Sequence, residues 1–102
     1  MLVSNIASNL VPTPGVTDQS VAVDNTVKEL ASLDADTTHV KFTLDGADAR
    51  ATFDGSDPAA DNGHLIPANA NGVWSKREAA ALKIIRAAGT DAYLHVTEFT
   101  LP

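Results

Sequence analysis

The fold is decided by the stretch His39-Val-Lys-Phe-Thr-Leu-Asp-Gly-Ala-Asp-Ala-Arg-Ala-Thr-Phe53. Apolar and polar residues alternate on both sides of Asp45-Gly46, so each half presents one apolar face, as a half-buried strand does. Glycine adopts a positive φ at low cost, which makes Asp45-Gly46 a suitable turn. The stretch therefore predicts an antiparallel hairpin of two strands, residues 39–44 and 49–53.

Further strands are predicted on either side of this stretch. Residues 92–99 alternate, and residues 82–87 contain a β-branched pair, so the two segments predict a C-terminal hairpin across the tight connection at 88–91. Three valines of one parity predict a strand over residues 21–27. A helical turn that starts at Asn25-Thr26 remains an alternative for that segment.

One short helix is predicted after Ser75. The side chain of Ser75 can accept from the amide three residues on, while Glu78 reaches back to the backbone of Ser75, which is the capping-box spacing. The alanines that follow have strong helix propensity. Several short strands joined by turns, with one minor helix, predict a mainly β fold: a small antiparallel β-sandwich or barrel.

The first twenty residues differ from the rest of the chain. They carry one charge, contain Pro12-Thr13-Pro14 and show no sustained period, which indicates extended backbone. We expect an extended N-terminal arm, residues 1–20, followed by a β-sandwich body, residues 21–102. The alternative is a terminus without fixed structure. The aliphatic side chains of the arm are expected to contact a partner, and they are Leu2, Val3, Ile6, Leu10 and Val11.

Composition excludes several classes of function. The chain has 102 residues, no cysteine and a net charge of −6. Nucleic acid is not an expected partner, because binding to phosphates depends on many cations. Disulfides, thiolate zinc sites and cysteine nucleophiles are excluded. No segment reaches the roughly 18 apolar residues that span a bilayer, and no cationic leader precedes an apolar stretch, so we expect no membrane partner and a retained N-terminus.

The polar residues predict no catalytic machinery. Ser56, His64 and Asp57 contain the groups of a hydrolytic triad, but the sequence lacks a nucleophile elbow and no phosphate-binding loop is present. We therefore expect a protein that is not an enzyme and that has no cofactor. Two interpretations of the acidic loop Asp54–Asp61 remain open: a calcium site, or carboxylates that bond nearby amides and set turns.

The sequence has one cationic cluster, formed by Lys76, Arg77, Lys83 and Arg86. It is either a solvated face that balances nearby carboxylates or a surface that docks on an acidic neighbour. In the second interpretation, Lys76 and Arg77 are expected to contact the partner. Trp74, just before the cluster, is expected in the core because the chain has so few other large rings.

Four segments resemble those of small virion proteins of tailed bacteriophages: Asp48-Ala-Arg-Ala-Thr-Phe-Asp-Gly-Ser-Asp-Pro58, Gly63-His-Leu65, Leu82-Lys-Ile-Ile-Arg-Ala87 and Ala92-Tyr-Leu-His-Val-Thr97. The resemblance covers about residues 20–100 and implies a compact β-sandwich in the virus particle, a capsid decoration or cement protein. The turn Phe53–Pro58 is also similar to one in the immunoglobulin-like accessory domains of chitobiase-type glycosidases. The chain lacks the Tyr-x-Gly-Pro that follows the turn in those domains.

The resemblance leads us to expect a virion structural protein that binds the outer surface of the capsid and stabilises the head. Its partners would be the major capsid protein or other virion proteins, with a homotrimer as one arrangement that the hypothesis allows. Synthesis would take place in the cytoplasm of the bacterial host. One alternative is a tail, neck or fibre-base component. The other is a carbohydrate-binding accessory module, for which the chain offers few aromatic residues.

Overall fold

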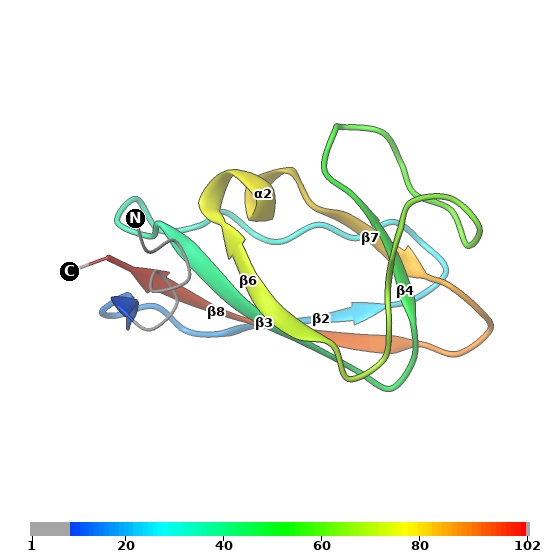
Figure 1. Ribbon diagram of the computed structural model, residues 1–102, viewed down its shortest axis with the longest axis horizontal. Coiled ribbons are helices and arrows are strands. Elements are labelled where there is room, and N and C mark those ends of the chain that lie inside the picture. The colour runs from blue at the N-terminus through cyan, green and yellow to red at the C-terminus, as the bar shows by residue number, and fades with distance from the viewer. Residues whose placement is uncertain (1–8, 102) are drawn as a thin grey trace.

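Two antiparallel sheets pack against each other in the computed structural model, which describes residues 9–101 (Figure 1). The first sheet contains β1 (Val11–Pro12), β2 (Gln19–Val23), β3 (His39–Asp45), β6 (Asn71–Ser75) and β8 (Ala92–Thr100). The second sheet contains β4 (Ala49–Thr52), β5 (His64–Ile66) and β7 (Lys83–Arg86). The predicted mainly β fold is confirmed.

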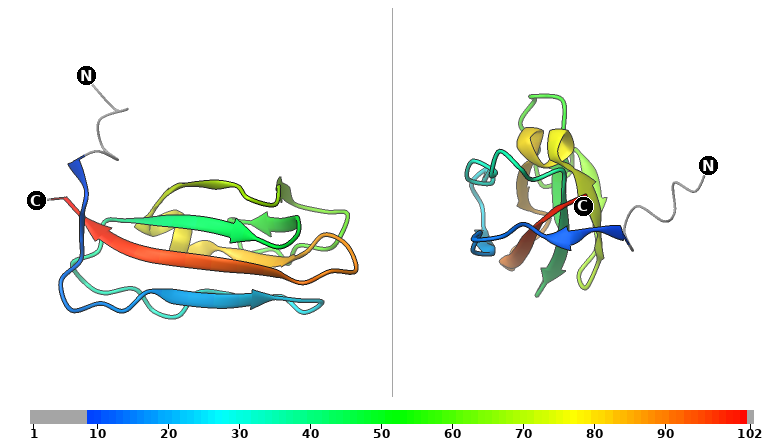
Figure 2. Two further views of the ribbon diagram at one scale, coloured as in Figure 1. Left: turned by 90° about the horizontal axis from the view of Figure 1, so that it is seen from below. Right: turned by 90° about the vertical axis from the view of Figure 1, so that its left-hand side faces the viewer.

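The long strand β8 organises the first sheet. One edge of β8 pairs with β3, and β6 continues the sheet beyond β3. The other edge pairs with β2 near its start and with β1 at its end, so these two short strands follow each other along β8 (Figure 2). The first and last described strands of the chain are therefore neighbours.

The hairpin predicted for residues 39–44 and 49–53 is wrong, although both of its strands exist. Strand β3 pairs with β6 and β8, whereas β4 pairs with β5 and β7 in the other sheet. Gly46 does adopt a positive φ of 92°, but the chain it redirects crosses between the sheets. In a sandwich the inner faces of both sheets are apolar, so alternation does not identify the neighbouring strand.

The predicted C-terminal hairpin is wrong for the same reason. Strand β7 pairs with β4, whereas β8 pairs with β1, β2 and β3. The strand predicted over residues 21–27 is shorter than expected and ends at Val23, because the Asp24 carboxylate accepts from the Thr26 amide at 3.0 Å and turns the chain.

The predicted helix is present as α2 (Lys76–Ala81), between β6 and β7. Both halves of the capping box form: the Ser75 hydroxyl accepts from the Glu78 amide at 3.1 Å, and the Glu78 carboxylate accepts from the Ser75 amide at 2.9 Å. Ala79 and Leu82 are buried and fix the helix against the sheets. No helix in the part of the chain that the structure describes is long and apolar enough to cross a membrane.

Trp74 lies in the core, as expected, with 8% of its surface exposed. Its ring stacks on Phe42 with centroids 3.9 Å apart, and the ring of Phe53, the residue that follows β4, packs against it in a T-shaped arrangement at 5.7 Å. Aliphatic residues complete the core from both sheets, and the largest fully buried ones are Val23, Val40, Leu44, Leu82, Ile84, Leu94 and Val96.

The described part of the expected arm contacts the rest of the fold. Leu10 and Thr13 are buried, and the Thr13 amide donates to the Glu98 carbonyl at 2.9 Å. A boundary at residue 20 falls inside β2. Val11 and Pro12 pair with Thr100 and Phe99 of β8, and Gln19 and Ser20 pair with Val96 and His95. The division into an arm, residues 1–20, and a body, residues 21–102, stays a prediction. Leu2, Val3 and Ile6 lie outside the described residues.

Candidate functional site: a polar cleft beside the 53–63 loop

A cleft of about 430 Å³ opens between the end of β4 and the start of β5. The loop 53–63, which joins these strands, forms most of its wall. The lining residues combine one aromatic ring with several polar groups, and they are Thr52, Phe53, Asp54, Ser56, Asn62, Gly63 and His64. The acidic loop Asp54–Asp61, singled out in the sequence, therefore lies beside a concave surface.

Arg50 on β4 fixes the end of the loop that leads into β5. Its guanidinium donates from Nη1 to the Gly63 carbonyl at 3.2 Å and from Nε to the Ala60 carbonyl at 3.4 Å. Within this segment, Ala59 and Asn62 exchange backbone hydrogen bonds of 2.9 and 3.0 Å. The Arg50 side chain thus stabilises the backbone of the loop.

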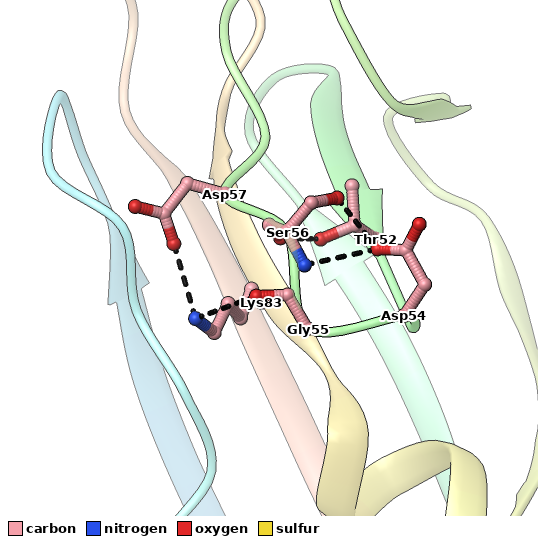
Figure 3. Close-up of polar contacts among 6 residues, drawn as sticks. All are labelled: Thr52, Asp54, Gly55, Ser56, Asp57 and Lys83. Atoms are coloured by element: carbon pink, nitrogen blue, oxygen red, sulfur yellow. Dashed lines mark hydrogen bonds and ion pairs between the residues drawn. The ribbon is translucent and has the colours of Figure 1, made fainter.

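Lys83 on β7 fixes the beginning of the loop (Figure 3). Its Nζ donates to the Gly55 carbonyl at 3.2 Å and pairs with the Asp57 carboxylate at 3.1 Å. The Thr52 hydroxyl, at the end of β4, donates to the Ser56 carbonyl of the same loop. Side chains of two strands therefore hold this loop in place.

Asp54 closes a turn in the way that the second interpretation of the acidic loop predicts. Its Oδ1 accepts from the Ser56 amide at 3.0 Å and from the Ser56 hydroxyl (Figure 3). These hydrogen bonds, the hydroxyl one first, hold the pKa of Asp54 below its ordinary value, because they stabilise the ionised form. Asp54 therefore presents a carboxylate to the cleft at neutral pH.

Asn62 and His64 are exposed at the cleft, and the charge of Asp54 lies close enough to His64 for the two side chains to interact. Among residues 9–101, neither side chain forms a hydrogen bond, and Oδ2 of Asp54 accepts none. The Phe53 ring lies beside them, with its centroid 6.3 Å from that of His64. The cleft thus combines an aromatic wall with polar atoms that are not used by the protein.

The arrangement does not form the triad that residue types alone would allow. Ser56 and His64 both line the cleft, but the Ser56 hydroxyl donates to Asp54 and the Asp57 carboxylate is paired with Lys83. Within residues 9–101, no group of three or more His, Cys, Asp or Glu side chains is placed to hold a metal ion.

Most of the predicted cationic cluster is engaged within the fold. Lys76 donates to two backbone carbonyls in the 34–35 turn, at 2.9 and 3.3 Å, and Arg86 pairs with Asp91 at 2.8 Å. Arg77 is exposed and, among the described residues, forms no hydrogen bond or ion pair. Of the two cations predicted to contact a partner, the structure thus leaves Arg77 available.

Glu98 is buried, with 5% of its surface exposed, and was not among the residues predicted to be functional. Its Oε1 accepts from the Asp34 amide at 2.7 Å and from the Thr37 hydroxyl at 2.8 Å. Glu98 follows Val96 at the same parity of β8, so the alternation placed it on the inner face, but its partners come from a loop about sixty residues earlier in the chain. Glu98 anchors that loop and lies apart from the polar cleft.

No family model, curated protein or solved structure matches this chain in the comparisons with known proteins.

Proposed function

We propose that this protein is a structural component of a bacteriophage virion, a decoration protein that binds the outer surface of the capsid and stabilises the head. The β-sandwich is the observation that carries the proposal. The resemblance of residues 20–100 to small virion proteins implies a compact β-sandwich, and residues 9–101 form two packed antiparallel sheets of that kind.

The use of polar side chains supports a structural role. Arg50, Lys83 and Glu98 hydrogen-bond backbone groups of loops, and so stabilise the fold instead of meeting at a reaction centre. The net charge of −6 favours the exterior of a particle over its DNA-lined interior, because phosphates repel an acidic surface.

Stabilisation would follow from mass action. A protein that binds the assembled shell and not its free subunits adds its binding free energy to the shell, about 2.7 kcal/mol per site when its free concentration is 100 times Kd. The surface offered to the shell would include Arg77 and exposed apolar side chains of the first sheet. Those side chains are Val11, Val73 and Tyr93. Leu10 is not part of this surface because it is buried.

The test uses heads of the phage whose genome encodes the chain, assembled with its gene deleted. Purified protein is added, and the heads are separated on a density gradient. We expect wild-type protein to sediment with the heads and to raise their temperature of disruption. Arg77→Glu should weaken binding, whereas Lys28→Glu, the same change of charge at a residue already paired with Asp24, should not.

Two results would overturn the proposal. One is wild-type protein that stays at the top of the gradient. The other is protein that sediments with isolated tails and not with heads, which would assign the tail, neck or fibre-base role instead.

A further inference from the structure

The polar cleft beside the 53–63 loop has a chemistry that the capsid role does not use. We propose that it binds a neutral carbohydrate, with Phe53 as the apolar wall and with Asp54, Asn62 and His64 as hydrogen-bonding groups. This function is independent of attachment to a particle. A volume of about 430 Å³ lies within the range of ligand sites, roughly 300–1,000 Å³.

The unused polar atoms of the cleft match a ligand rich in hydroxyl groups. The Asn62 amide can donate and accept, the His64 ring has a donor and an acceptor when neutral, and Oδ2 of Asp54 can only accept. A sugar hydroxyl also donates and accepts, so neighbouring hydroxyls of one ring can serve all three side chains. A ligand with acceptors only would leave Asp54 without a partner.

The Phe53 ring supplies the apolar contact that such a ligand requires. One face of a sugar ring exposes C–H groups, which pack against aromatic rings. Phe53 is half-buried and is held edge-on against Trp74, with centroids 5.7 Å apart. Its position is therefore set by the core before any ligand binds.

Charge selects against anionic ligands. Among the described residues, no lysine or arginine lines the cleft. Asp54 is ionised and the protein has a net charge of −6, so phosphates and acidic sugars are repelled. One carboxylate is too few for Ca²⁺, which takes six to eight oxygen ligands. A neutral polyhydroxylated molecule satisfies the donors and acceptors at no charge penalty.

The loop is held in the shape of the cleft before binding. Arg50 and Lys83 bond carbonyls of the loop, and Asp54 closes its turn. Binding then requires little ordering of backbone, and the free energy of contact is retained as affinity. Small sugars would bind weakly because they make few contacts, with Kd in the millimolar range.

The test is a ¹⁵N–¹H NMR titration of the wild-type protein with glucose, galactose and N-acetylglucosamine, each to about 50 mM, a limit set by the expected Kd. At least one sugar is expected to shift amides of residues 52–64 in a saturable way. Asn62→Ala should weaken that binding about tenfold, the equivalent of one lost hydrogen bond. Asp61→Ala is the matched control, since Asp61 is exposed on the same loop and does not line the cleft.

Several outcomes would overturn this inference. The first is an absence of amide shifts with all three sugars. The second is a set of shifts confined to residues outside 52–64. The third is an equal loss of sugar affinity in Asn62→Ala and Asp61→Ala. Saturable binding of inorganic phosphate or Ca²⁺ in the cleft would overturn it too. Spectra of each variant show whether the fold is kept. Because the titration uses protein alone, its failure leaves the head-binding result unaffected, and the reverse also holds.

Discussion

Asp54 and Asp24 are carboxylates that close turns with the hydroxyl and the amide of the residue two positions on. Ser56 donates both hydrogen bonds to Asp54, and Thr26 donates both to Asp24. In both, the side-chain hydrogen bond is the largest cause of a pKa below the ordinary value. The two turns therefore provide a test and its control within one molecule.

Ser56→Ala is expected to raise the pKa of Asp54, while the remaining bond from the backbone amide keeps that pKa below its ordinary value. The pKa of Asp24 should not change. Because folding lowers these pKa values, the stabilisation they give is present above the unfolded pKa and is lost as pH falls through the folded pKa. A ¹³C NMR titration of the aspartate carboxyl groups measures both values. An unchanged Asp54 pKa in the variant contradicts the prediction.

Glu98 is expected to matter more for stability than any exposed carboxylate. Glu98→Ala removes the acceptor of the Asp34 amide and of the Thr37 hydroxyl, and we expect a loss of about 2–3 kcal/mol in the free energy of unfolding. Glu98→Gln retains an acceptor oxygen and should lose less. Urea unfolding measures the change, with the exposed Glu29→Ala as the control. Equal effects at residues 98 and 29 would show that the buried bonds contribute nothing.

At the scale of elements, the pairing of β4 with β5 depends on Gly63. Its φ is 121°, and a Cβ there would lie 3.0 Å from the carbonyl oxygen of Ala51. Gly63→Ala is therefore expected to lower the free energy of unfolding by about 2 kcal/mol, from backbone strain and from the clash. Gly89→Ala is the control, because that position has open space and no positive φ. Thermal unfolding of both variants tests the difference, and equal melting temperatures would refute it.

The elements also show how far the sequence predicts this fold. The strands around Asp45-Gly46 and the helix after Ser75 were predicted correctly, because alternation and capping are local properties. The pairing of the strands was not predicted correctly, because β3 and β4 each have an apolar face although they belong to different sheets. The acidic loop Asp54–Asp61 was recognised in the sequence, with carboxylates that set turns as one of its two interpretations. The cleft beside this loop was not predicted, because its shape depends on side-chain contacts to the loop backbone from Arg50 on the preceding strand and from Lys83 on β7.

At the scale of the whole molecule, folding is dominated by contacts between distant parts of the chain. Strand β2 pairs with β8 at the other end of the sequence, and β8 also separates β2 from β3. Loop closure must precede these pairings, so we expect refolding in milliseconds to seconds, as in other sandwiches. Trp74 is the single tryptophan and is buried, which makes stopped-flow fluorescence a suitable probe. Complete refolding within microseconds would contradict this expectation.

The pairing of β1 with the end of β8 also determines how the molecule resists a mechanical pulling force. Val11 lies opposite Thr100 in an antiparallel ladder, so a pull that separates these two residues acts across the strands. Such a load falls on one rung of hydrogen bonds at a time, and the strands unzip at a lower force than when they are sheared along their length. Rupture would begin at β1 and proceed to β2. A partner that binds both β1 and β8 at this end would bear the applied force, and the hydrogen bonds between the two strands would not have to.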